Sequence, residues 1–248
     1  MATRTVRPTV TPTSEPDSTS GSAIRLGFWA AALTTVVATV FAVAAVATPA
    51  RSGPFCGAAC VPPPYVDVAR FIPGDYLWLI PGILLAPVFV VLVACIHGYS
   101  AETKKTFSRI ALSFAVSYAV VILVNYFVQF TVVIPSLQSG ETQSLSLFTQ
   151  YDPHGFFIAL EVLAYLMMSV AFWAAAPVFT GGRAERTIRR LFALNFPLAL
   201  AAFVGFWLLR HDLVAVEVTV LMINWLVLIV AGTLVSLVFR RAGRRWMK

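Results

Sequence analysis

Long uninterrupted apolar runs alternate along this chain with short segments that carry almost all of its charge. Six runs are long enough to cross the ~30 Å hydrocarbon core of a bilayer, which takes ~20 helical residues at ~1.5 Å each. They are Leu26–Ala47, Tyr76–Ile96, Ile110–Ile134, Phe156–Phe179, Leu191–Leu209 and Leu213–Phe239. None alternates apolar and polar residues as barrel strands do. The pattern predicts an all-α integral membrane bundle of six transmembrane helices.

Composition excludes a soluble globular domain. Of the 248 residues, 59% are hydrophobic and 12% are charged, whereas a soluble domain has ~45–50% apolar and ~25% charged residues. The formal net charge of +7 does not indicate a nucleic-acid partner, because the positive charges lie in clusters between apolar runs.

The placement of the positive charges predicts an orientation. Fifteen of the 18 Lys and Arg residues lie in the N-terminal tail, the second and fourth loops and the C-terminus, and the other three are Arg51, Arg70 and Arg210. Short cytoplasmic loops retain Lys and Arg, so both termini are expected in the cytoplasm (N-in/C-in) of an inner (plasma) membrane. The excess of Arg over Lys, with abundant Ala and Val, is typical of a GC-rich bacterial genome.

The spans and charges predict three segments of the chain. They are a disordered Thr/Ser/Pro-rich cytoplasmic tail over 1–23, a six-helix transmembrane domain over 24–239 and a basic cytoplasmic tail over 240–248. The expected partners are the lipid bilayer and, at the arginine-rich face, anionic lipid headgroups. A membrane-protein partner and a homo-oligomer stay open. The first span also resembles a cleaved signal peptide ending near Ala47, but its apolar run exceeds the ~7–15 residues of a signal core, which favours retention.

Polar side chains inside the spans provide the candidate site, because such groups are costly in lipid and face the bundle interior. The candidates are Glu161, Asn125, Gln129, Glu217, Asn224, His154 and Tyr165. Helical spacing predicts that they form an outward-facing cluster from three helices. One interpretation is a cation or proton site at a carboxylate. The other is hydrogen bonding that holds the helices together.

Local signals also predict where three helices begin or end. Asp75 is expected to cap the second span. Asp152 is expected as the N-cap of the fourth span, with Pro153 at its first position. This start would place His154 on the helix face of Glu161, two turns away. The third span is expected to end near Pro135.

The two cysteines of the first outer loop, Cys56 and Cys60, are expected to form a disulfide that orders the loop. A redox-active pair is the alternative, although such pairs usually have two intervening residues rather than three. His154 and His211 lack any metal-binding spacing, so no metal or cofactor is predicted. Phosphate-binding loops and nucleophile motifs are also missing from the sequence, which favours a protein that is not an enzyme.

Three segments resemble stretches of uncharacterised polytopic membrane proteins of prokaryotes with about six spans. They read CVPPPYVDVARFIPGDYLW, ACIHGYS and YDPHGFFIALEVLAYLMMS and fall within Cys60–Ser169. The resemblance implies a multi-span membrane protein and carries no activity.

The leading hypothesis is a small transporter or permease-like component for a cation or small solute, with an outward-facing polar site. A non-transporting assembly or sensory partner is the alternative. An intramembrane redox, metal or haem protein is a weaker one. The chain has no duplicated halves of the kind that mark inverted-repeat transporters, which counts against the first hypothesis.

Overall fold

The computed structural model describes residues 18–141 and 145–246, and every regular element in these ranges is a helix. The α-helices are α1 (Ser18–Ala47), α2 (Leu79–Tyr99), α3 (Lys105–Val128), α4 (Ile134–Ser139), α5 (Phe156–Ala175), α6 (Arg183–Ala202) and α7 (Leu213–Trp246). In this part of the chain, six helical segments are long and apolar enough to cross a membrane. They are Ser22–Ala47, Gly74–Tyr99, Glu102–Ser139, Phe156–Val178, Arg183–Leu208 and Leu213–Arg244. The predicted all-α multi-pass fold is confirmed.

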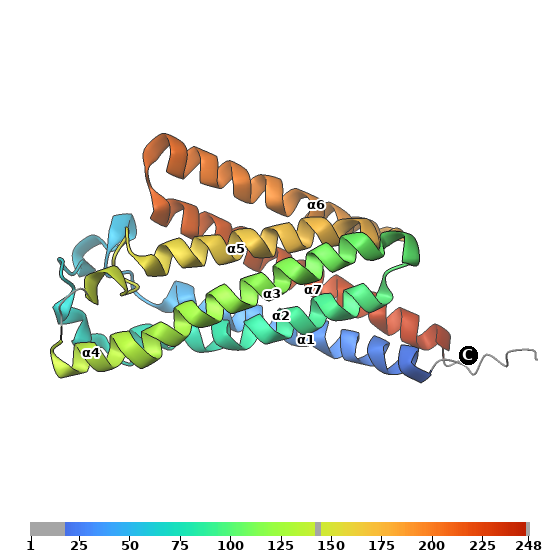
Figure 1. Cartoon of the computed structure of the whole chain (residues 1–248), viewed down its shortest axis with the longest axis horizontal. Coiled ribbons are helices and arrows are strands. Elements are labelled where there is room, and N and C mark those ends of the chain that lie inside the picture. Colours follow the sequence, from blue (N-terminus) through green and yellow to red (C-terminus); the bar gives the residue numbers. More distant parts are fainter. Residues whose placement is uncertain (1–17, 142–144, 247–248) are drawn as a thin grey trace, which may run out of the picture.

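Five of the long helices form a closed ring. Helix α1 packs against α2 and α7, α3 packs against α2 and α5, and α5 closes the ring on α7. Helix α6 lies outside the ring against α5 and α7, at the edge of the bundle in Figure 1. Its span is the least enclosed, with 22% of its apolar window buried against 56% for the span of α5. The interior of the ring is therefore the place where polar groups are best shielded from lipid.

The bundle has two unlike ends (Figure 1). The end that we call the loop end carries the short 3₁₀ helices Gly53–Phe55, Gly57–Ala59, Val66–Phe71, Gly74–Tyr76 and Leu145–Leu147. At the opposite end, the terminal end, α1 begins and α7 ends. An even number of spans brings both termini to one end. That this end faces the cytoplasm stays a prediction.

Helix α1 is an integral part of the ring. At Gly232 of α7, a Cβ atom would lie 2.5 Å from Thr35 Oγ1, and at Gly27 it would lie 2.8 Å from the ring of Phe239. Glycine at these positions lets side chains of the facing helix pack directly against the glycine backbone. That the first span is retained after synthesis stays a prediction.

The third span does not end near Pro135 as predicted. A π turn over Gln129–Val133 follows α3, and α4 then continues to Ser139. Proline removes one N–H donor and crowds the preceding turn of an α-helix, and a widened turn just before it leaves room for the ring. Gly140, with φ +73°, ends the helix, and the N–H of Glu141 donates to the carbonyl of Ser136 at 2.9 Å.

Two predicted N-caps are also wrong. Helix α2 begins at Leu79, and Asp75 lies in the preceding 3₁₀ turn with its carboxylate turned toward Arg51. Helix α5 begins at Phe156, three residues beyond the predicted start at Pro153. In both places the carboxylate accepts a hydrogen bond from a group outside the helix that it was expected to cap.

The Asp152 carboxylate instead closes a turn by accepting the N–H of His154 at 2.9 Å. Gly155 follows as the actual N-cap. A Cβ atom at Gly155 would lie 2.8 Å from the carbonyl oxygen of Leu147, so this close approach fixes where the helix can start.

The expected segment boundaries shift at both termini. Helix α1 begins at Ser18, within the predicted tail, and residues 1–17 of that tail lie outside the described residues. Helix α7 continues to Trp246, through most of the predicted basic tail. Arginine has a high helix propensity and no proline interrupts this stretch, so the basic residues extend the last span as a helix.

Candidate functional site

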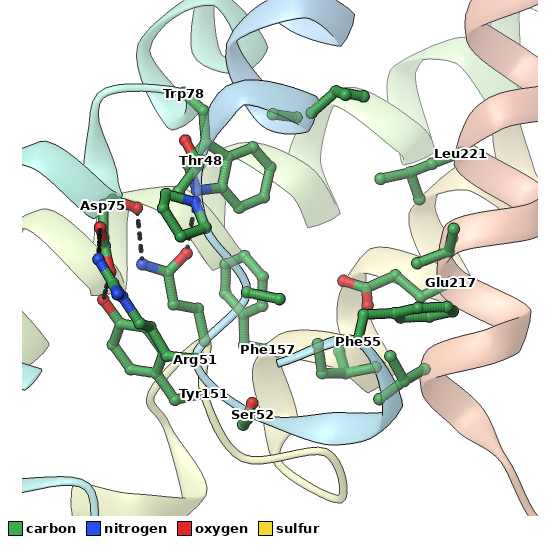
Figure 2. Close-up of a pocket in the computed structure, with 18 of the residues that line it drawn as sticks. Thr48, Arg51, Ser52, Phe55, Asp75, Trp78, Tyr151, Phe157, Glu217 and Leu221 are labelled. Atoms are coloured by element: carbon green, nitrogen blue, oxygen red, sulfur yellow. Dashed lines mark hydrogen bonds and ion pairs between the residues drawn. The ribbon is translucent and has the colours of Figure 1, made fainter. Parts of the chain in front are cut away.

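A cavity of about 350 Å³ lies at the loop end of the bundle, bounded by the C-terminal end of α1 and the beginnings of α2, α5 and α7 (Figure 2). Most of its wall is apolar, including the aromatic rings of Phe55, Trp78, Phe157 and Trp225. Its polar lining residues are Thr48, Arg51, Ser52, Asp75, Gln150, Tyr151 and Glu217. The cavity is thus an apolar chamber with charged groups at a few places in its wall.

Glu217 brings a carboxyl group to the α7 side of this cavity (Figure 2). Helix α7 starts just after Asp212, whose Oδ1 accepts the N–H of Ala215 at 2.9 Å as an N-cap does. Glu217 follows in the second turn and retains 9% of its surface exposed. A carboxyl group in such a position can exchange protons or cations with the cavity.

Glu161 lies behind Glu217, fully buried on α5. The hydroxyl group of Tyr126 on α3 donates a hydrogen bond to Glu161 Oε1. The Glu161 and Glu217 carboxyls lie close enough to influence each other electrostatically, but Glu161 Oε2 is buried without a hydrogen-bond partner among the described residues. Two carboxyls and a tyrosine hydroxyl from three helices therefore form one buried group, which we call the carboxyl pair and its tyrosine.

The opposite side of the cavity carries an ion pair. Arg51 Nε lies 2.9 Å from Asp75 Oδ2, and Arg51 Nη2 lies 3.3 Å from Asp75 Oδ1. The guanidinium group also lies over the ring of Phe71, 3.6 Å from its centroid. The hydrogen bond to Asp75 raises the pKa of Arg51. The two charges compensate each other, so this side of the cavity is close to neutral.

Further hydrogen bonds attach this ion pair to the loop before α5. Tyr151 donates from its hydroxyl to Asp75 Oδ2 at 3.3 Å, and burial raises the pKa of Tyr151. Gln150 Nε2 donates to the Asp75 carbonyl at 3.0 Å, and Trp78 Nε1 donates to Gln150 Oε1 at 3.1 Å. Sequence reasoning missed this network, because Asp75 and Gln150 are 75 residues apart.

The predicted amide residues of α3 and its π turn bind backbone rather than the cavity. Asn125 Nδ2 donates to the carbonyl of Phe157 at 3.0 Å, and Gln129 Nε2 donates to the carbonyl of Phe148 at 2.7 Å. Neither Asn125 nor Gln129 lines the cavity. Both amides hold α3 and its π turn against α5 and the loop before it, as the interhelical interpretation expects.

Asn224 and Tyr165 are fully buried away from the cavity wall. Asn224 Nδ2 donates to Ser169 Oγ at 3.0 Å and so joins α7 to α5. The ring of Tyr165 packs on Tyr118, with 5.6 Å between centroids. These two candidates belong to helix packing inside the ring.

His154 does not share a helix face with Glu161. It precedes the start of α5, lies in the turn closed by Asp152 and is exposed. The reason is the late start of α5 at Phe156. Of the seven predicted candidates, only Glu217 lines the cavity, with Glu161 directly behind it.

Cys56 and Cys60 are joined in a disulfide, with 4.9 Å between their Cα atoms. This five-residue loop follows directly on Phe55, whose ring forms part of the cavity wall (Figure 2). Cys95 is free and buried on α2. The disulfide is therefore placed to hold the loop that covers one side of the cavity.

Comparison of the chain with protein-family models, with curated proteins and with solved structures finds no match. The geometry of the cavity and its carboxyl pair is accordingly the basis for a function.

Proposed function

We propose that the protein is a small transporter that binds a small organic cation in the loop-end cavity, in exchange for a proton held by Glu161 and Glu217. The observation that carries this proposal is the charge balance of the cavity wall. Among its ionisable lining residues, Arg51 and Asp75 compensate each other and Tyr151 keeps its proton. Glu217 is the remaining ionisable group, and its charge has no positive partner in the wall.

The apolar part of the wall supports a cation that carries hydrocarbon. The rings of Trp78, Phe157 and Trp225 lie around the same space as the Glu217 carboxyl. Aromatic faces attract cations by ~0.5–2 kcal/mol, most strongly away from water. A carboxylate beside aromatic rings favours an amine or quaternary ammonium over a small hydrated metal ion, which such walls would not solvate.

The carboxyl pair supplies the proton. Two neighbouring carboxyls shielded from water do not both ionise, because the second negative charge would be repelled and poorly solvated. The pair therefore holds one proton before the cation arrives. A cation that binds at Glu217 displaces this proton, which leaves through the cavity, so one positive charge enters the site as another leaves it. Tyr126 donates to Glu161 and stabilises the charge that develops on the pair.

We further propose that the cavity opens on the side opposite the cytoplasm. The basis is the concentration of 15 of the 18 Lys and Arg residues in segments expected at the terminal end. With that orientation in a bacterial plasma membrane, the cation is taken from outside the cell.

The first test is binding of benzyltrimethylammonium, a permanently charged cation, with the neutral neopentylbenzene as its isostere. Calorimetry in detergent solution should show that the cation binds and that neopentylbenzene does not. A pH dye in the same weakly buffered solution should show release of up to one proton per bound cation. Glu217→Gln should abolish both signals, and Glu161→Gln should abolish proton release. Glu102→Gln, at an exposed carboxylate of the terminal end, is the matched control.

The second test is uptake of radiolabelled benzyltrimethylammonium into proteoliposomes with an imposed pH gradient that is acidic inside, so that proton efflux can drive cation entry. Uptake driven by that gradient and lost in Glu217→Gln is the expected result. Binding without uptake would contradict transport and favour the sensory alternative. Equal binding of neopentylbenzene would contradict the role of the carboxyl.

A further inference from the structure

A second hollow lies at the terminal end, on the outer surface of the bundle where α3 begins, α5 ends and α6 begins. It encloses about 520 Å³. Helices α3 and α6 both pack against α5, so the hollow is a groove over the end of α5 with one of these helices on each side. The residues that matter for its chemistry are Lys104, Phe107, Ile110, Trp173, Arg189 and Arg190.

Three cations, one in the 3₁₀ turn Glu102–Lys104 before α3 and two on α6, reach this groove without a carboxylate partner. Lys104, Arg189 and Arg190 form no salt bridge within the residues that the structure describes. Neither nearby carboxylate forms an ion pair with one of these three cations. Glu102 lies 4.0 Å from the neighbouring Lys105, and Glu185 accepts the N–H groups of Thr180 and Gly181 and the hydroxyl of Tyr99. The groove therefore attracts an anion.

The remainder of the groove is apolar and uncovered. Phe107, Ile110 and Trp173 are 44%, 43% and 52% exposed, and Ala174 and Ala193 leave space between the helices. The Lys104 amine lies 5.7 Å from the centroid of the Phe107 ring, so the positive and apolar parts adjoin. A free phosphate ion would satisfy the cations and leave this apolar surface exposed.

We propose that the groove binds one anionic phospholipid. Its phosphate lies among Lys104, Arg189 and Arg190, and an acyl chain runs along Phe107, Ile110 and Trp173. Basic pockets between membrane helices recognise anionic headgroups in this way. The bound lipid joins α3 to α6, the helix that lies outside the five-helix ring. The proposal is independent of the cation site, which lies at the other end of the bundle.

The test is native mass spectrometry of the full-length protein released from nanodiscs that contain equal amounts of dioleoyl phosphatidylglycerol and dioleoyl phosphatidylcholine. We expect one phosphatidylglycerol to remain bound per chain. Arg189→Gln with Arg190→Gln should lower its affinity about 30-fold, since each charge contributes ~1 kcal/mol. The matched control is Arg183→Gln with Arg186→Gln, at two exposed arginines of α6 outside the groove.

A second variant distinguishes lipid binding in the apolar groove from lipid binding by electrostatic attraction alone. Ala193→Trp fills the apolar part while all three cations remain, and it should also release the bound lipid. Equal retention of phosphatidylcholine would overturn the proposal, as would equal loss in the control pair or full retention in Ala193→Trp. Displacement of the lipid by millimolar inorganic phosphate would show a phosphate site that does not use the apolar wall, and would overturn the lipid assignment.

Discussion

The Arg51 guanidinium and the Asp75 carboxylate form an ion pair at 2.9 Å that joins the segment after α1 to the turn before α2. The side chains are only 14% and 6% exposed. Removing one member of such a pair leaves the other charge shielded from water without compensation. The pair therefore holds the loop end of the bundle closed around one side of the cavity.

Asp75→Asn should lower the free energy of unfolding by ~3 kcal/mol, in the range found when one partner of a buried pair is removed. Thermal unfolding in detergent measures the loss. Asp67→Asn, at an exposed carboxylate of the same loop, should leave the unfolding temperature unchanged. Removal of both charges by Arg51→Met with Asp75→Leu should recover part of the loss. Equal unfolding temperatures for wild type and Asp75→Asn would contradict this role.

Tyr151 should make stability fall at alkaline pH. Burial raises the pKa of its hydroxyl above the ordinary value of about 10. Above that pH, the unfolded chain loses this proton while the folded protein keeps it, so unfolding becomes more favourable by up to ~1.4 kcal/mol per pH unit. Tyr151→Phe should lose less stability than wild type between pH 8 and pH 11 in thermal unfolding. Parallel pH profiles would contradict the assignment.

The six spans could be predicted from the sequence because an apolar run of about 20 residues is typical of a membrane-spanning helix. Glu161 and Glu217 could be named as candidates from the sequence, because carboxyl groups inside apolar spans are rare and costly in lipid; their role stays a prediction. Depth along the spans does not separate these two from Asn125 and Asn224, because all four are expected at similar depths in three different spans. Only the packing shows that the amides bind other helices while Glu217 meets the cavity.

The residues that sequence reasoning missed lie in loops, where partners are set by tertiary contacts. Asp75 and Asp152 look like helix caps locally, yet each has a nearer partner in the folded chain. Pro135 is typical of a helix end, but the π turn before it lets the helix continue. In each case the local preference amounts to ~1 kcal/mol or a few at most, which is small enough for packing to override.

Asn224 should matter for stability and little for cation binding. Its amide joins α7 to Ser169 of α5 at 3.0 Å, inside the ring and away from the cavity wall. Interhelical hydrogen bonds of this kind contribute ~0.6 kcal/mol on average and up to ~1.7. A double-mutant cycle of Asn224→Ala and Ser169→Ala should give a coupling energy in that range. Loss of benzyltrimethylammonium binding in the folded Asn224→Ala variant would place this residue in the site instead.

The disulfide should protect two of the three cysteines from alkylation. In denaturant without reductant, only Cys95 should react with iodoacetamide, and all three cysteines should react after reduction. Mass spectrometry counts the added groups. Cys56→Ser with Cys60→Ser should still bind the cation if the disulfide only orders the loop, whereas complete loss of binding would indicate a direct role.

Gly82 of α2 connects the packing of the ring to the carboxyl pair. A Cβ atom at this position would lie 2.5 Å from the Tyr126 ring and 2.9 Å from that of Phe41. Tyr126 must then move, and it is the residue whose hydroxyl binds Glu161. Gly82→Ala should therefore cost ~1–3 kcal/mol of stability, as overpacking does, and should also weaken proton release on cation binding.

The matched control is Gly98→Ala on the same helix, where an added Cβ would meet nothing within 4 Å. This variant should be as stable as wild type or slightly more so, because alanine favours the helix by ~1 kcal/mol over glycine. Unfolding temperature and dye-monitored proton release measure the two effects separately. If Gly82→Ala loses stability but releases the proton normally, Tyr126 supports the fold without tuning Glu161, and the hydrogen bond between them has no part in proton exchange.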